Sequence, residues 1–218
     1  GDGSMRIVYD GTQAWGNVSS IERYAITGQN YNARSDDNKY IGYMYGGALG
    51  EASTSYEQAT KNETSSSIKI KIDEWYNQNI KNTGYEKYLQ DNIFCNDRSI
   101  HSGNGYGQHN TVYNVYERIV NNSSPTFICQ NKNDSFTVED TIKGNGALTY
   151  PVGLLTTDEA LAAGNGIYNT MNSNYYLYVS ESKWTISMTP GVYANGAYIL
   201  DINGWADIGA GVSYIDSS

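Results

Sequence analysis

The sequence predicts an α+β fold, built as one domain over residues 1–218. Helix-like patterns concentrate in the first two thirds of the chain, whereas strand-like patterns fill the last third as an antiparallel meander. Because strand and helix patterns do not alternate, a doubly wound sheet is disfavoured. No segment has the composition of a linker, and only three prolines are present. A chain of 218 residues is long enough to bury a core without metals or many disulfides.

A strand is expected at the start of the chain, over residues 4–9. The preceding residues Gly1, Asp2 and Gly3 suit the turn of a hairpin. We therefore expect that the first strand of this hairpin belongs upstream of Gly1 and has been trimmed from the chain.

Three helices are expected before residue 121. Ser67 is expected to cap the first helix, which runs to about Ile80 and aligns Ile68, Ile72, Trp75 and Tyr76. A short second helix from Glu86 to Asn92 places Tyr88, Leu89 and Ile93 ahead of the turn at Cys95. The third runs from Thr111 to Val120 and aligns Val112, Val115, Tyr116 and Ile119. Apolar residues at three- and four-residue spacing face a core.

A fourth helix has the clearest boundaries, and strands follow it. Thr156 and Glu159 form a capping box, and Gly164 is a natural C-cap after the alanine-rich turn. Beyond this helix, turn residues separate four strand-like segments, at 175–179, 184–188, 197–202 and 211–215. These four segments are the predicted meander.

Composition narrows the classes of partner. The net charge is −9, which disfavours a nucleic-acid partner because binding to phosphates needs a basic patch. No apolar run approaches the roughly 18 residues of a membrane span. The chain has 21 Tyr, 23 Gly, 24 Asn and 21 Ser, the residue types that recognition loops favour. An AT-rich genome also enriches Asn and Tyr, although the excess of Lys that it should produce is missing. Genome composition and selection for extracellular recognition both stay open as causes.

The two cysteines, Cys95 and Cys129, lack the number and spacing of a structural zinc site. An even count in a chain of extracellular composition allows one disulfide. The alternative is a pair of buried free thiols. We favour the disulfide.

An ordered series of segments resembles a known family. It comprises residues 92–98, 127–137, 148–160, 175–178 and 184–188, and its sharpest part is 150–160 followed by the Trp184 segment. The series resembles a domain of unknown function found in surface proteins of Firmicutes, similar to the C-type-lectin-like fold of formylglycine-generating enzymes. The resemblance covers roughly Met5 to Ile202. It implies a C-type-lectin-like fold, and it implies that one strand is missing at each end of this chain.

Two departures limit what this resemblance implies about activity. Formylglycine generation needs reactive cysteines late in the domain, and none follows Cys129. The Glu-Pro-Asn, Gln-Pro-Asp and Trp-Asn-Asp triplets of calcium-dependent lectins do not occur either. Neither that enzymatic activity nor calcium-dependent sugar binding is expected here.

Candidate catalytic groups are weak. His101 and His109 flank a glycine-rich stretch near Cys95, so a Cys–His nucleophile pair is conceivable, but a disulfide-bonded thiol cannot attack a substrate. The glycines imitate a phosphate loop without the Lys-Ser/Thr that should follow. We expect solvated histidines, no catalytic residue and no cofactor.

Acidic residues occur in groups without the ligand spacing of a calcium loop. We expect solvated turns for Asp36 and Asp37 and for the group Asp134, Glu139 and Asp140. Asp97 and Arg98 are expected to form a structural ion pair or turn next to the disulfide. Helix capping and the helix dipole account for Asp158 and Glu159. We therefore expect no metal site.

The C-terminal region is the predicted binding surface, because large aromatic and adaptable polar side chains alternate along its strands and turns. The candidate ligand-binding residues are Trp184, Tyr193, Asn195, Tyr198, Trp205, Asp207 and Tyr214. About half of them are expected to belong to the core, since strand residues alternate between faces.

The sequence therefore predicts a non-catalytic ligand-binding or adhesion module of a bacterial surface protein. Its expected location is extracellular or at the cell surface, and its expected partner is a protein or glycan ligand on a cell surface. The rival hypothesis is a structural subunit of a pilus-like or other surface assembly.

Overall fold

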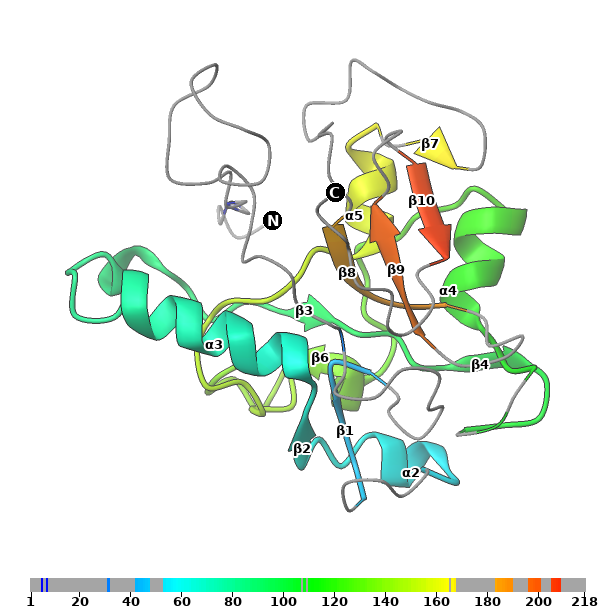
Figure 1. Cartoon of the computed structure of the whole chain (residues 1–218), viewed down its shortest axis with the longest axis horizontal. Helices are drawn as coiled ribbons and strands as arrows, with labels where there is room; N and C mark the ends of the chain where they lie inside the picture. Colours follow the sequence, from blue (N-terminus) through cyan, green and yellow to red (C-terminus); the bar gives the residue numbers. More distant parts are fainter. Residues whose placement is uncertain are drawn as a thin grey trace, which may run out of the picture.

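A computed structural model describes most of the middle of the chain and parts of its last third (Figure 1). The described residues are 5, 7, 31, 42–47, 53–106, 108, 110–164, 166–167, 183–189, 196–200 and 205–208. Only the backbone is described for residues 166–167, 183–184, 189, 196–200 and 205–208. The strands expected at 175–179 and 211–215, most of the strand at 4–9 and both chain ends lie outside the described residues.

The first described elements are a short antiparallel strand pair, a helix in the connection between the two strands, and a long helix that follows. The elements are β1 (Met44–Tyr45), α2 (Tyr56–Ala59), β2 (Thr64–Ser65) and α3 (Ser67–Asn79). Strands β1 and β2 pair antiparallel, with Met44 opposite Ser65. Figure 1 shows α3 along one side of the molecule and the largest sheet on the other.

Helix α3 is confirmed, but its cap is Ser66 rather than Ser67. The side chain of Ser66 accepts a hydrogen bond from the backbone N–H of Lys69 at 3.2 Å, and Ser67 is already helical. Two adjacent serines are equivalent in the sequence, and only the backbone geometry selects one of them. The predicted stripe is largely confirmed, since Ile68, Ile72 and Tyr76 are buried and Trp75 is half-buried.

The prediction of a helix over residues 86–92 is wrong. Only a single 3₁₀ turn forms, η1 (Glu86–Tyr88), and Tyr88 is 70% exposed. Leu89 already has extended backbone, which leads the chain into the next strand. Leu89 and Ile93, the other two apolar residues of the predicted pattern, are half-buried.

The middle of the chain alternates very short strands with single helical turns. Its elements are β3 (Phe94–Cys95), β4 (Ile100–Ser102), β5 (Val112–Tyr113), α4 (Asn114–Tyr116), the π-helical turn η2 (Glu117–Asn121), the 3₁₀ turn η3 (Lys132–Asp134) and β6 (Ser135–Phe136). Strand β3 pairs with β6, and β4 pairs with β5. The third predicted helix therefore starts late, because Val112 and Tyr113 pair as a strand. Val115 and Ile119 are buried as expected.

The last third contains one helix and one larger sheet. Its elements are α5 (Thr157–Ala162), β7 (Gly166–Ile167), β8 (Lys183–Thr189), β9 (Gly196–Leu200) and β10 (Trp205–Ile208). The capping box at Thr156 and Glu159 is confirmed. Strands β8, β9 and β10 are antiparallel neighbours, as a meander requires, but β7 pairs parallel to β10. The sequence patterns missed β7 and β10.

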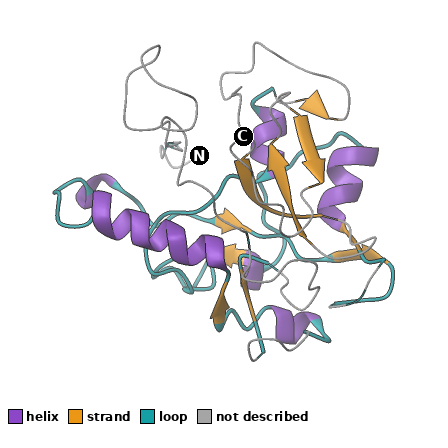
Figure 2. Cartoon of the chain, viewed as in Figure 1, coloured by secondary structure: helices purple, strands orange, loops and turns teal. Residues whose placement is uncertain are grey.

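Helices and small sheets are mixed throughout the described chain, which confirms the α+β class (Figure 2). Strand β8 connects two apolar clusters. Ile186 packs with Tyr43, Ile72 and Phe136, whereas Met188 packs with a second cluster. That second cluster also contains Tyr113, Val115 and Ile119.

The other face of β8 is buried against the start of α5. The backbone N–H of Thr157 donates to Ser187 Oγ at 2.9 Å, and the hydroxyls of Thr157 and Thr185 lie 3.3 Å apart. Because both faces of β8 are covered, this strand fixes the position of α5. Helix α5 in turn carries part of the candidate site.

Candidate functional site

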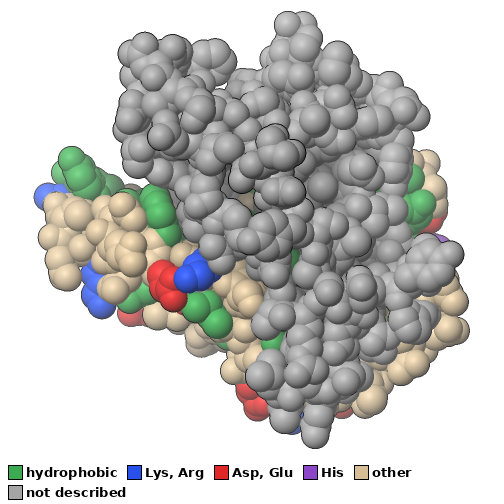
Figure 3. All heavy atoms as spheres, viewed as in Figure 1, with side chains coloured by type: hydrophobic (Ala, Val, Ile, Leu, Met, Phe, Trp, Pro, Cys, Tyr) green, Lys and Arg blue, Asp and Glu red, His purple; other side chains and the backbone are tan. Residues whose placement is uncertain are grey.

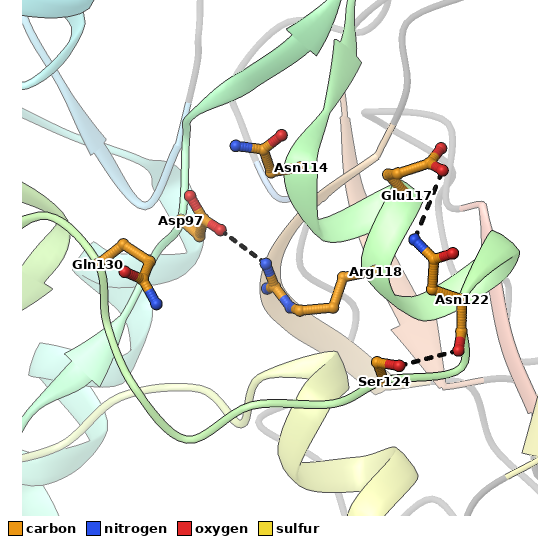
Figure 4. Close-up of a pocket in the computed structure, with 7 residues that line it drawn as sticks. All are labelled: Asp97, Asn114, Glu117, Arg118, Asn122, Ser124 and Gln130. Carbon is orange, nitrogen blue, oxygen red and sulfur yellow. Dashed lines mark hydrogen bonds and ion pairs between the residues drawn. The ribbon is translucent and has the colours of Figure 1, made fainter.

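An open polar pocket of about 520 Å³ lies between the segment after β3, helix α4 with η2, and the loop that follows η2 (Figure 4). Seven side chains line it: Asp97, Asn114, Glu117, Arg118, Asn122, Ser124 and Gln130. Its volume falls within the range of small-molecule sites. All seven side chains are polar, so the pocket offers hydrogen-bonding groups to a ligand.

Asp97 is held in place by its two buried neighbours. Asn96 accepts the backbone N–H of Tyr43 at 2.7 Å and donates to the carbonyl of Ile186 at 2.9 Å, which ties it to β8. Asp97 itself accepts hydrogen bonds from the backbone N–H and the hydroxyl of Ser99. Its other carboxylate oxygen is left for Arg118.

Arg98, the residue after Asp97, is fully buried and cross-links several segments of the chain. Its Nε donates to Asp134 at 2.7 Å, and its Nη atoms donate to four further oxygens. Those oxygens are the carbonyls of Met44, Ala59 and Asn133 and the side chain of Asn62. The expected ion pair between Asp97 and Arg98 is therefore wrong, since Arg98 pairs with Asp134 and Asp97 pairs with Arg118. The alternative, a turn, is confirmed by the bond from the backbone N–H of Ser99 to Asp97.

Asp134 is not the solvated turn residue that the sequence indicated. It is fully buried, paired with Arg98, and it accepts a hydrogen bond from the Tyr56 hydroxyl at 3.0 Å. Burial raises the pKa of Asp134, although the charge of Arg98 opposes the shift. This carboxylate is structural.

Arg118 forms one wall of the pocket and bridges two carboxylates. Its Nε and Nη2 donate to the two oxygens of Asp158 at 2.7 and 2.9 Å, and Nη1 donates to Asp97 at 3.0 Å. Burial opposes the charge of Arg118, but the hydrogen bonds and charges of Asp158 and Asp97 outweigh it and raise its pKa. Figure 4 shows this guanidinium directed at Asp97 across the pocket.

Asp158 has a larger role than the helix capping expected from the sequence. It is buried, and besides Arg118 it accepts the backbone N–H of Thr126 at 2.9 Å. It therefore connects α5, η2 and the loop after η2. Glu159, in contrast, has the expected capping role.

The loop over residues 122–130 forms the rim of the pocket. Its first part is tied down because the backbone N–H of Ser124 donates to the carbonyl of Arg118 at 2.9 Å. Its second part is fixed by the Cys95–Cys129 disulfide, with an S–S distance of 2.04 Å, which confirms the predicted bond. Between these anchors, Phe127 and Ile128 are 75% and 70% exposed.

The charges around the pocket sum to a negative value. Arg118 faces the two carboxylates of Asp97 and Asp158. Glu117 adds a third carboxylate, and its Oε1 lies 3.5 Å from Nδ2 of Asn122. His101 is exposed and lies 3.9 Å from Glu117. On the described part of the face in Figure 3, acidic and basic side chains are interspersed.

Neither Ser124, which lines the pocket, nor Cys95, which lies near it, is paired with a base as a catalytic nucleophile would be. Ser124 donates its hydroxyl to the carbonyl of Asn122 rather than to a base, and Cys95 is oxidised. Within the part of the chain that the structure describes, no three His, Cys, Asp or Glu residues are grouped to hold a metal ion. The arrangement can bind a polar ligand by hydrogen bonds.

The predicted ligand-binding residues lie elsewhere. Trp184, Tyr198, Trp205 and Asp207 belong to β8, β9 and β10, and pairing places both Trp184 and Asp207 opposite Ile199. Tyr193, Asn195 and Tyr214 lie outside the described residues. None of the seven lines the pocket, and their role in binding stays a prediction.

The other sequence candidates are structural or lie outside the described residues. Gly103 and Gly105 have φ angles of +108° and +107°, so the described part of the glycine-rich stretch is irregular backbone that needs glycine. Asp140 is partly exposed, and hydrogen bonds from the backbone N–H groups of Lys143 and Ile142 lower its pKa. Asp36, Asp37 and His109 lie outside the described part of the chain.

No protein-family model, curated protein or solved structure matches this chain. The described residues contain no helix with the length and apolar character needed to cross a bilayer. The arguments for function therefore depend on the pocket itself.

Proposed function

We propose that this chain is a non-catalytic binding module of a bacterial surface protein, and that the polar pocket receives its ligand. The observation that carries this proposal is a pocket lined only by polar side chains whose rim is fixed by a disulfide. Disulfides persist in oxidising compartments, which supports an extracellular location. A rim that is already ordered lowers the entropy cost of binding.

The chemistry of the lining supports binding over catalysis. The carboxylates of Asp97 and Asp158 are committed to Arg118, which leaves neither as a poised general base. The third carboxylate, Glu117, accepts hydrogen bonds from the side chains of Asn121 and Asn122. The remaining lining groups are amides and a hydroxyl, which orient ligands rather than activate them. The resemblance to Firmicutes surface domains and their C-type-lectin-like fold is part of the same proposal, and the α+β class supports it.

A pocket-filling variant tests the proposal. Wild-type protein is screened against arrayed cell-surface glycans and extracellular peptides, and each ligand is then titrated against Ser124→Trp. The bulky indole should occupy the pocket and weaken binding by about tenfold or more. The matched control is Asn77→Trp, on the exposed side of α3, which should bind like wild type.

Two results would overturn the proposal. One is a ligand whose affinity is the same for wild type and Ser124→Trp, since the ligand would then bind elsewhere. The other is conversion of a bound ligand to product, detected by mass spectrometry after incubation, which would make the chain an enzyme. Antibody labelling of intact source cells tests the extracellular location.

A further inference from the structure

The only arginine of the pocket has little charge to offer a ligand. Three of its five N–H groups are bonded to Asp158 and Asp97, whose side chains are 5% and 10% exposed. With Glu117 included, one positive charge faces three negative charges. A carboxylate or phosphate ligand would enter a site of its own sign and be repelled.

The rest of the lining consists of neutral groups that both donate and accept hydrogen bonds. Asn114, Asn122 and Gln130 each present an amide, and one N–H of Asn122 is shared with Glu117. The Ser124 hydroxyl donates to the carbonyl of Asn122 and keeps its oxygen as an acceptor. An amide offers two N–H donors beside one carbonyl acceptor in a single plane. Two neighbouring hydroxyls of a sugar match this arrangement, because each hydroxyl can donate and accept.

The rim adds an apolar surface next to these polar groups. Ser124 and Gln130 line the pocket, and the loop between them exposes Phe127 and Ile128. A sugar ring has a face of C–H groups that packs on such side chains. The loop is held on both sides of Phe127 and Ile128. On one side the backbone N–H of Thr126 donates to Asp158, and on the other Cys129 is disulfide-bonded to Cys95.

We propose that the pocket binds a neutral saccharide of about one or two rings, a size that suits its volume of about 520 Å³. The amides of Asn114, Asn122 and Gln130 bind the sugar hydroxyls, and the exposed rim supports the ring. This inference rests on the proposed function, because it assigns the ligand class of the same pocket.

The test uses defined sugars and single amide deletions. Lactose, cellobiose and diacetylchitobiose are titrated by calorimetry and ligand-observed NMR, with a sulfated form of each disaccharide as its anionic counterpart. At least one neutral disaccharide should bind, with its anionic counterpart about tenfold weaker or worse. Asn122→Ala and Gln130→Ala should each weaken binding by about threefold to tenfold. Asn77→Ala, an exposed asparagine on α3, should leave the affinity unchanged.

The failures of the two proposals are distinguishable. Equal or tighter binding of the anionic sugars overturns the neutral-saccharide inference. So does a chain that binds none of the sugars but binds a peptide in a manner sensitive to Ser124→Trp, and that result leaves the proposed function intact. Sugar binding that neither Ser124→Trp nor the amide deletions weaken overturns both.

Discussion

Two arginines bind aspartates in different surroundings. Arg98 is fully buried, and each of its five N–H groups has a protein acceptor. The side chain of Arg118 is 19% exposed and forms three such bonds at the wall of an open pocket. An arginine–aspartate pair thus cross-links the core where it is sealed from water, and forms part of a pocket wall where solvent reaches it.

Removal of Arg98 should have the largest effect. Arg98→Met leaves Asp134 buried without its partner and should lower the free energy of unfolding by about 3–5 kcal/mol. Urea unfolding measures the change. The double variant Arg98→Met with Asp134→Leu removes both charges and should recover part of the loss, whereas an equal loss in the double variant would show that the charge of Asp134 is not the cause.

Loss of the disulfide should come next, and it separates the two regions. Cys95→Ala with Cys129→Ala opens a bond that spans 34 residues, which should cost about 3–4 kcal/mol in chain entropy. We expect the pocket rim to become susceptible to limited proteolysis while the Arg98 region stays protected in hydrogen exchange. Uniform loss of protection would contradict the division into two regions.

Alkaline pH should lower the stability of the fold, because several tyrosines are buried in it. Burial raises the pKa of Tyr31, Tyr43 and Tyr113. Below pH about 10 the folded and unfolded forms both keep these protons; above it the unfolded chain loses them first, so unfolding becomes easier. Above pH about 10, the titration of each tyrosine in the unfolded chain should lower the free energy of unfolding by about 1.4 kcal/mol per pH unit.

Thermal unfolding between pH about 8 and 11 measures this slope. Tyr113→Phe should make the slope shallower, because one titrating group is removed. A slope that Tyr113→Phe leaves unchanged would show that other groups cause the alkaline loss.

Removal of Arg118 should have the smallest effect on stability. Arg118→Met leaves the largely buried carboxylates of Asp97 and Asp158 without their shared partner, but Arg118 itself is 19% exposed at an open pocket. Water can therefore replace its hydrogen bonds, and we expect a loss of about 1–2 kcal/mol. Repeating the measurement in about 1 M salt should shrink the loss, because mobile ions screen exposed charges. The Arg98→Met loss should not respond to salt, and an equal response in both variants would erase the distinction.

Local features of the fold could be predicted from the sequence. The capping box at Thr156 and Glu159 needs only four neighbouring residues. The disulfide was favoured over two free thiols by an even cysteine count in a chain of extracellular composition. The prediction at 86–92 was wrong because a short apolar pattern does not determine whether a core is available. Strand β10 was missed because it is short and depends on its pairing with β9.

The pocket could not be predicted because its contacts span long sequence separations. Arg118 reaches Asp97 and Asp158 across 21 and 40 residues. A local interpretation of Asp158 as a helix-capping residue was reasonable but incomplete. The nearest available signal was the run of Asn and Ser at 121–124, which became part of the rim.

The disulfide also has a mechanical consequence. Of the residues that line the pocket, all except Gln130 lie between Cys95 and Cys129. A pulling force applied along the chain therefore bypasses this segment through the S–S bond, and about 110–120 Å of contour length stays hidden until the bond is reduced. A ligand held in the pocket would be carried inside a covalent loop that tension on the chain cannot extend.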